Sequence, residues 1–191
     1  MEVRRHNVVT DALEEGAFDL VHARALLQHL LEPVSVLRKM VVALKPGGWL
    51  LVEESDVDFV VPDEVVDAAA AALFRTCWSV CDRVFTDGGG DWHYGRRVFH
   101  DVCAQSLIEL GAEGRTFIVR GGSQHARFLR LSVEQLRDRV IDSGLVTESD
   151  ENPSVAVRDV PRGSPSTPRA VKKHEIGAVV SNEDQSMMSR K

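Results

Sequence analysis

The sequence predicts an α/β fold, and the prediction rests on the stretch from Phe18 to Asp56. Two short apolar segments in it, residues 17–21 and 49–52, are typical of buried strands. Between them lies the pattern of an amphipathic helix, closed by a Pro-Gly-Gly turn. These observations predict one β-α-β unit. In such a unit, ligands bind at the loops that follow the strands, outside the carboxyl ends of the sheet.

The helix of this unit has clear start and stop signals. Glu32-Pro33 opens it, because proline is tolerated in the first turn of a helix. Its apolar residues recur at spacings of three, four and three, which places one stripe against a sheet (Val34, Leu37, Val41 and Leu44). Lys45 to Gly48 is expected to stop the helix and turn the chain. The apolar run over residues 49–52 is typical of a parallel strand covered on both faces.

Two further strands are predicted outside this unit. The valines of residues 2–9 favour a first strand, although its centre is polar. Residues 116–119 form another short apolar run that ends at a pair of glycines. The sheet is therefore expected to have about four strands.

Three helices are predicted after the β-α-β unit. An alanine-rich stretch with an apolar stripe predicts a long helix over residues 63–85. A second apolar stripe predicts a helix over residues 98–110. Ser132 with Gln135 matches a capping box and predicts a last short helix that ends at Gly144.

The chain changes character near its C-terminus. Residues 146–191 contain no leucine and no aromatic residue, yet they hold four of the seven prolines. A segment so poor in apolar residues cannot bury enough surface to offset the entropy of ordering. We therefore expect a partial domain over residues 1–147 and a disordered or frame-altered tail over residues 148–191, with residues 176–180 as a poor candidate for a final strand.

Composition and charge exclude several classes of protein. The net charge of −6 argues against binding of nucleic acid, which requires a basic face. No apolar run approaches the roughly 20 residues that cross a bilayer, and no signal core is present, so a cytoplasmic protein is expected. The three cysteines are too few for a disulfide scaffold and have no zinc-like pairing, and no metal site is predicted. Cys77 and Cys81 are expected to be reduced, buried packing residues.

Several motifs in this order resemble a known family. FDLVHARALLQHL and PVSVLRKMVVALKPGGWLLVEE, with the later YGRR, GAEGRTFIVRGG and SVEQLRDRVIDSGLVTE, are similar to class I S-adenosylmethionine-dependent methyltransferases. The style is that of the UbiE and type 11 group, the small-molecule methyltransferases of actinobacteria. The resemblance covers about residues 2–148. It implies an incomplete doubly wound, Rossmann-like methyltransferase sheet and S-adenosyl-L-methionine as the cofactor.

The resemblance also implies which residues border the cofactor. Asn7 and Val8 would follow the family's third strand, where an aspartate often bonds the adenine amino group; an amide oxygen can accept the same hydrogen bond. Three residues would follow the fourth strand beside the methionine portion (His22, Ala23 and Arg24). His29 would start the next helix and face the site. For Arg24 a surface salt bridge is the alternative, and for His29 a packing role beside leucines.

The acceptor side is implied in the same way. Glu53, Glu54 and Asp56 would end the fifth strand near the substrate entrance, with a solvated strand-end group as the alternative for one of the two glutamates. Since Glu53 and Glu54 are adjacent on a strand, their side chains point to opposite faces and cannot act as a paired acid and base. An aromatic and basic insertion would wall the substrate pocket (Trp92, Tyr94 and Arg97). His29 or His93 would accept the acceptor's proton.

The sequence departs from the family in two respects that bear on activity. It contains no Gly-x-Gly-x-x-Gly pattern, and no glycine precedes Gly16, so the family's first strand with its glycine-rich loop and the acidic residue that grips the ribose are expected to be missing. The family's antiparallel final strand is also expected to be missing, because residues 176–180 are only a poor candidate for it. Two functions follow: a truncated methyltransferase with a small-molecule acceptor, or an inactive remnant that acts as an interaction protein. The open sheet edge of the remnant would seek a partner or aggregate, and a homodimer is one assembly that stays open.

Overall fold

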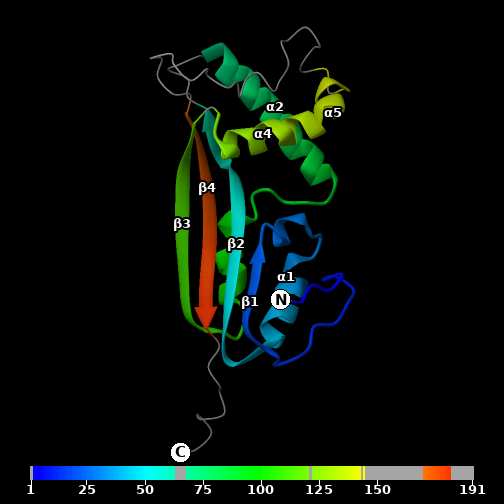
Figure 1. Ribbon diagram of the computed structural model, residues 1–191, viewed down its shortest axis with the longest axis vertical. Helices are drawn as coiled ribbons and strands as arrows, with labels where there is room; N and C mark the ends of the chain where they lie inside the picture. The colour runs from blue at the N-terminus through cyan, green and yellow to red at the C-terminus, as the bar shows by residue number, and fades with distance from the viewer. Residues whose placement is uncertain (1, 63–67, 121, 143, 145–169, 182–191) are drawn as a thin grey trace, which may run out of the picture. The chain divides into compact units, whose positions relative to one another are not determined.

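The structure is a computed structural model that describes residues 2–62, 68–120, 122–142, 144 and 170–181. It confirms the α/β class and the sheet of about four strands (Figure 1). The elements follow in the order β1 (Phe18–Arg24), η1 (Leu27–His29), α1 (Pro33–Val42), β2 (Leu44–Pro62), α2 (Ala68–Asp87), α3 (Gly95–Cys103), β3 (Ile108–Arg120), α4 (Gln124–Gln135), α5 (Arg137–Asp142) and β4 (Ala170–Ser181). The strand order in the sheet is β1-β2-β4-β3.

The predicted β-α-β unit is confirmed. β1 pairs with β2 in parallel, with Leu20 opposite Trp49 and Arg24 opposite Glu53. Pro33 is the first residue of α1, as its position after Glu32 predicted. β2 is covered less completely than its apolar sequence suggested, because Trp49 is 44% exposed.

The predicted turn at Lys45 to Gly48 is wrong, because these residues lie inside β2. The helix ends earlier, at Val42. Pairing shifts from Phe18 opposite Leu44 to Leu20 opposite Trp49, so β2 bulges over the Pro-Gly-Gly segment. Gly47 supplies the left-handed backbone that the bulge requires, with φ of +77°.

Three other predicted elements need correction. Residues 2–9 form no strand. The helix predicted over residues 98–110 is α3, which ends at Cys103, and β3 begins at Ile108. The capping-box serine, Ser132, lies inside α4, where its hydroxyl donates to the Phe128 carbonyl oxygen at 3.0 Å. The residue that does cap α4 is Ser123, whose Oγ accepts from the amide of Ala126 at 3.2 Å.

The C-terminal region contains a strand that is longer than the sequence suggested. β4 includes the candidate segment 176–180 and lies between β2 and β3 in the sheet. The expectations that a final strand is missing and that the tail is disordered are therefore wrong for residues 170–181. The rest of the predicted tail, residues 148–169 and 182–191, lies outside the described residues.

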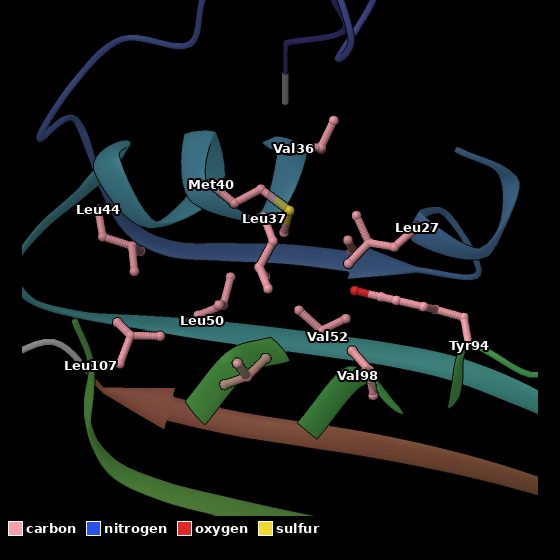
Figure 2. Close-up of a cluster of buried hydrophobic side chains, with 12 residues drawn as sticks. Leu27, Val36, Leu37, Met40, Leu44, Leu50, Val52, Tyr94, Val98 and Leu107 are labelled. Carbon is pink, nitrogen blue, oxygen red and sulfur yellow. The ribbon is translucent and has the colours of Figure 1, made fainter. Parts of the chain in front are cut away.

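The chain divides into two compact units, and each has its own apolar core. The first contains residues 1–56, 93–114 and 175–191. Its core joins α1, η1, β1, β2 and α3 (Figure 2). The largest side chains in it are fully buried: Leu27, Leu37, Leu50, Val52, Tyr94, Val98 and Val102.

The second unit contains residues 57–92 and 115–174. The helices α2, α4 and α5 pack against one another in it. Cys77 and Cys81 are buried between these helices as free thiols, which confirms their predicted packing role, whereas Cys103, in the first unit, is exposed. Among the described residues, no helix is long and apolar enough to cross a membrane.

Candidate functional site

Polar side chains gather at the carboxyl end of β1 and on the part of β2 that pairs with it, in the first unit. His22 Nε2 lies 2.8 Å from Glu53 Oε2, and both side chains are about two-fifths exposed. Arg24, at the end of β1, is exposed. Ala23 is 5% exposed and part of the core, so its side chain does not face a ligand. His22 and Glu53, which the sequence placed separately on the cofactor and acceptor sides, are thus brought together by the parallel register.

The neighbouring carboxylate, Glu54, points the opposite way and holds the loop after β1. Its Oε1 accepts from the amides of Leu26 at 3.1 Å and Leu27 at 2.8 Å, and its Oε2 accepts from Gln28 at 3.4 Å. The side chain is 1% exposed. Burial raises the pKa of Glu54, and the three amide hydrogen bonds oppose that rise. Glu53 and Glu54 therefore serve different surroundings, as their alternation on the strand predicted.

His29 ends the short helix η1, and its ring is exposed. Its Nε2 lies 3.4 Å from Nε2 of Gln28. Gln28 is 6% exposed, and its Oε1 is buried without a hydrogen-bond partner in the described part of the chain. A buried carbonyl oxygen left without a donor is unfavourable by about 1–3 kcal/mol, so this atom is a natural acceptor for a water or ligand donor.

Asp56 anchors the start of α3. It is fully buried, and its two oxygens accept from Arg96 Nε and Arg96 Nη2, each at 2.7 Å. His93 Nδ1 lies 3.8 Å from the same carboxylate. Paired, forked hydrogen bonds of this kind fix the guanidinium in both position and orientation. His93, a predicted proton acceptor, is therefore placed beside a buried negative charge.

Tyr94 and Arg97 are adjacent through a cation-π contact, with the guanidinium carbon 5.9 Å from the ring centroid. Tyr94 is only 1% exposed. Burial, with contributions from the carboxylates of Asp101 and Glu54, raises the pKa of the Tyr94 phenol. In Figure 2 its ring extends along the core with the hydroxyl near Leu27. The hydroxyl makes no hydrogen bond of good geometry with any described residue.

The N-terminal residues are tied to α1. Lys39 Nζ donates to the carbonyl oxygens of Val9 at 2.6 Å, Val8 at 3.3 Å and Asp11 at 3.3 Å. Asn7 Oδ1 accepts from the Val9 amide at 3.0 Å in a local turn. Val8 packs partly buried against the core of the first unit. Asn7 and Val8 are thus held by a loop rather than by the strand that the sequence suggested.

Trp92 belongs to the second unit. Its ring stacks on Trp78 at a centroid distance of 5.1 Å and on Phe85 at 4.8 Å. It also packs against both apolar clusters of that unit. The structure therefore shows this predicted substrate residue in an aromatic packing role.

Of the three buried polar residues that the structure describes, the sequence placed Glu54 and Asp56 near the substrate entrance and missed Gln28. The signal for Glu54 was present in the sequence, because side chains alternate between the faces of a strand. Counting in twos from Leu50 reaches Val52, Glu54 and then Asp56, and all four are buried. An acidic residue on a core-facing position requires a partner, so this pattern marks Glu54 as a structurally engaged carboxylate. Nothing comparable marks Gln28, whose burial depends on how the loop folds.

Comparison with known proteins now identifies the family. Residues 2–109, more than half of the chain, match the methyltransferase domain family. The protein therefore belongs to the class I S-adenosylmethionine-dependent methyltransferases.

Two curated relatives and one solved structure show how far the similarity extends. The chain is 34% identical over 83 residues to methyltransferase str2 of Strobilurus tenacellus, which covers 44% of this chain and 29% of that protein. It is 44% identical over 54 residues to methyltransferase str3 of the same organism, covering 28% and 19%. The YcgJ protein of Bacillus subtilis has a similar fold, with a TM-score of 0.54 and 10% identity over 95% of this chain and 70% of that chain. The matches to the curated relatives thus span less than a third of their length.

Proposed function

We propose that the protein takes part in the transfer of a methyl group from S-adenosyl-L-methionine to a small-molecule acceptor. The observation that carries the proposal is the cluster at the carboxyl end of β1, where His22 contacts Glu53 of β2, found in a chain of this family. Ligands of open α/β sheets bind at such strand ends. The rings of His22 and His29 and the Arg24 side chain are exposed there, where a ligand can reach them.

The residues present suit part of the cofactor. Asn7 Oδ1 uses one lone pair for the Val9 amide, and a carbonyl oxygen has a second one that can accept from an adenine amino group. Val8 lies beside it. His22, Arg24 and the backbone at Ala23 would border the methionine portion, and the buried Gln28 oxygen still needs a donor. When bound, the cofactor supplies an activated methyl group on a sulfonium centre.

The protein's own contribution would be positioning and proton removal. An in-line displacement depends mainly on holding the acceptor atom in line with the methyl group. His29, with its exposed ring, is our first choice to accept the acceptor's proton. His93 is the second, because its Nδ1 lies 3.8 Å from the Asp56 carboxylate, which can orient the ring.

Glu53, Tyr94 and Arg97 are proposed as acceptor contacts. Arg97 is exposed and suits an acidic group on the acceptor, with Tyr94 as the surface on which its guanidinium lies. Glu53 suits a hydrogen-bond donor and is already oriented by His22. Trp92 belongs to the other unit, and its role in binding stays a prediction.

Isothermal titration of the purified chain with S-adenosyl-L-methionine tests the proposal. Binding in the micromolar range is expected. His29→Ala should weaken binding or methyl transfer at least tenfold, while the matched variant His100→Ala, which replaces an exposed histidine of α3, should leave both unchanged. Absence of binding up to millimolar cofactor would refute an autonomous enzyme.

The alternative function is that of an inactive remnant acting as an interaction protein. One observation favours it: β1 is a terminal strand of the sheet, with Phe18 39% and Leu20 55% exposed. An edge strand with exposed apolar residues tends to pair with another chain. A homodimer by light scattering, together with no cofactor binding, is the result that this alternative predicts; a monomer would contradict it.

A further inference from the structure

The loop after β1 is held by a single buried carboxylate. Glu54 accepts from three consecutive amides, of which the shortest bond is 2.8 Å, to Leu27. Hydrogen bonds from amides to an ionised oxygen are roughly twice as strong as neutral ones. These bonds act on a segment that begins with a strained residue, because Ala25 has a left-handed φ of +47°. The conformation of the loop after β1 is therefore fixed by a side chain of β2.

This arrangement is unfavourable for folding. Glu54 lies on the face of β2 that also carries Leu50 and Val52, both fully buried. Burial raises the pKa of Glu54 despite three hydrogen bonds. Desolvation therefore disfavours the charged carboxylate by more than the amide hydrogen bonds favour it. An apolar residue at this position would serve stability better. A charged residue at such a place suggests a role in geometry rather than in stability.

The segment that Glu54 holds leads directly to the candidate base. Leu26, Leu27 and Gln28 precede His29, and Gln28 Nε2 lies 3.4 Å from His29 Nε2. Leu27 and Gln28 are buried, so the loop is pinned on one side by packing and on the other by the carboxylate. The exposed His29 ring is then the one part of η1 that projects from this pinned loop.

We propose that Glu54 is a positioning residue that sets the place and orientation of Gln28 and His29 at the carboxyl end of β1. The inference rests on the proposed function for the use of His29, but the positioning itself is a property of the chain without any ligand. It acts through the loop backbone, so Glu54 touches neither cofactor nor acceptor.

The test compares Glu54→Gln with the wild-type chain by amide hydrogen exchange and histidine-ring NMR. The variant keeps the size of the side chain but places an amide group, which cannot accept, against one of the backbone donors. Amide exchange at Leu27 and Gln28 should accelerate on the order of tenfold to a hundredfold. The His29 ring resonances should shift, while the midpoint of global unfolding stays equal or rises. Asp19→Asn, which removes an exposed carboxylate from β1, is the control and should change none of these.

Two results would overturn the proposal. One is unchanged exchange at Leu27 and Gln28 in the variant. The other is faster exchange spread evenly over β2, with His29 unmoved, because that is the signature of a merely structural residue.

A measurement on the wild-type chain covers the case in which the variant does not fold. Lowering the pH should shift the amides of residues 26–28 together, at a pH above the ordinary glutamate range of about 4.3, because protonation removes the acceptor charge. The shift should persist in His29→Ala, which separates it from titration of that ring, and Tyr94 stays protonated throughout. No common shift would refute the proposal. Since none of these readouts uses the cofactor, failure of cofactor binding would refute the proposed function alone.

Discussion

Four consecutive residues of β2, from Glu53 to Asp56, each contact a different part of the first unit. Glu53 contacts His22, and Glu54 holds the loop before His29. The Ser55 carbonyl oxygen would lie 2.6 Å from a Cβ added to Gly95, so only glycine fits at the start of α3. Asp56 fixes Arg96. At the scale of single residues, this stretch of β2 is therefore where the candidate site is organised.

The buried Glu54 carboxylate should make stability depend on pH. Its pKa is raised in the folded state, so its contribution to the free energy of unfolding is fully present below the unfolded pKa of about 4.3 and is lost as the pH rises through the folded pKa. Urea unfolding of the wild type and Glu54→Gln between pH 4 and pH 8 measures this. The free energy of unfolding of the wild type minus that of the variant should fall as the pH rises. A difference that is flat or grows with pH would contradict the assignment.

The three cysteines should differ in reactivity. Burial, with a smaller contribution from Cys77, raises the pKa of Cys81 to about 12, so almost no thiolate forms at neutral pH. Cys77 is buried beside it and Cys103 is exposed. A chromogenic disulfide reagent should therefore label one thiol per native chain at pH 8 and three in denaturant. Cys103→Ser should abolish the native labelling, and rapid labelling of a second thiol would disagree with the packing of α2.

Among the elements, the β-α-β unit is the one whose packing follows most directly from its sequence. The spacing of apolar residues predicted a stripe on α1, and Val36, Leu37 and Met40 are its buried residues. Leu37 lies on the predicted stripe, but Val34 and Val41 are only partly buried. The stripe was right in direction, because a helix on a sheet buries one face, and its centre is displaced toward Val36 and Met40.

Leu37 should carry much of the stability of this element. It is completely buried between α1 and the sheet, so Leu37→Ala removes apolar contacts and leaves a cavity. A loss of about 2–5 kcal/mol in the free energy of unfolding is expected. The matched variant Val42→Ala, at a position of α1 that is 52% exposed, should change it by less than about 0.5 kcal/mol. Chemical denaturation of both variants checks the prediction, and equal losses would show that Leu37 is not in the core.

At the scale of the whole molecule, the sheet is completed by a strand that is distant in sequence. β4 is inserted between β2 and β3, although more than a hundred residues separate its start from the end of β2 in the chain. Backbone groups of a strand in this position pair on both sides, so its removal would leave two neighbouring strands with unpaired donors and acceptors.

Ending the chain after residue 169 tests the importance of β4. Loss of cooperative unfolding or aggregation is expected, because the edges of both β2 and β3 would be exposed. Circular dichroism during thermal unfolding and size-exclusion chromatography measure these effects. A chain ending after residue 181, which keeps β4, is the control and should behave as the full chain does. A cooperative, monomeric protein ending at residue 169 would show that β4 is dispensable.

The part of the fold that the sequence by itself determined is the part whose signals are local. The period of α1, the proline at its start and the apolar segments of β1 and β2 all lie within 40 residues, and nearest-neighbour packing satisfies them. The contact of His22 with Glu53, which was not predicted, comes from the parallel register that the structure shows. The family resemblance rested on these segments and is confirmed.

The other features of the fold were decided only by the tertiary structure, because at those places one local sequence pattern is compatible with two structures. Ser123 and Ser132 can both cap a helix, and packing of α4 selected the first. Residues 108–110 continue a helical stripe in sequence but pair as a strand once β4 lies between β2 and β3. The role of Glu54 likewise depends on a loop 26 to 28 residues earlier in the chain. Contacts between distant segments outweigh local propensity at these places, and they are also what assembles the candidate site.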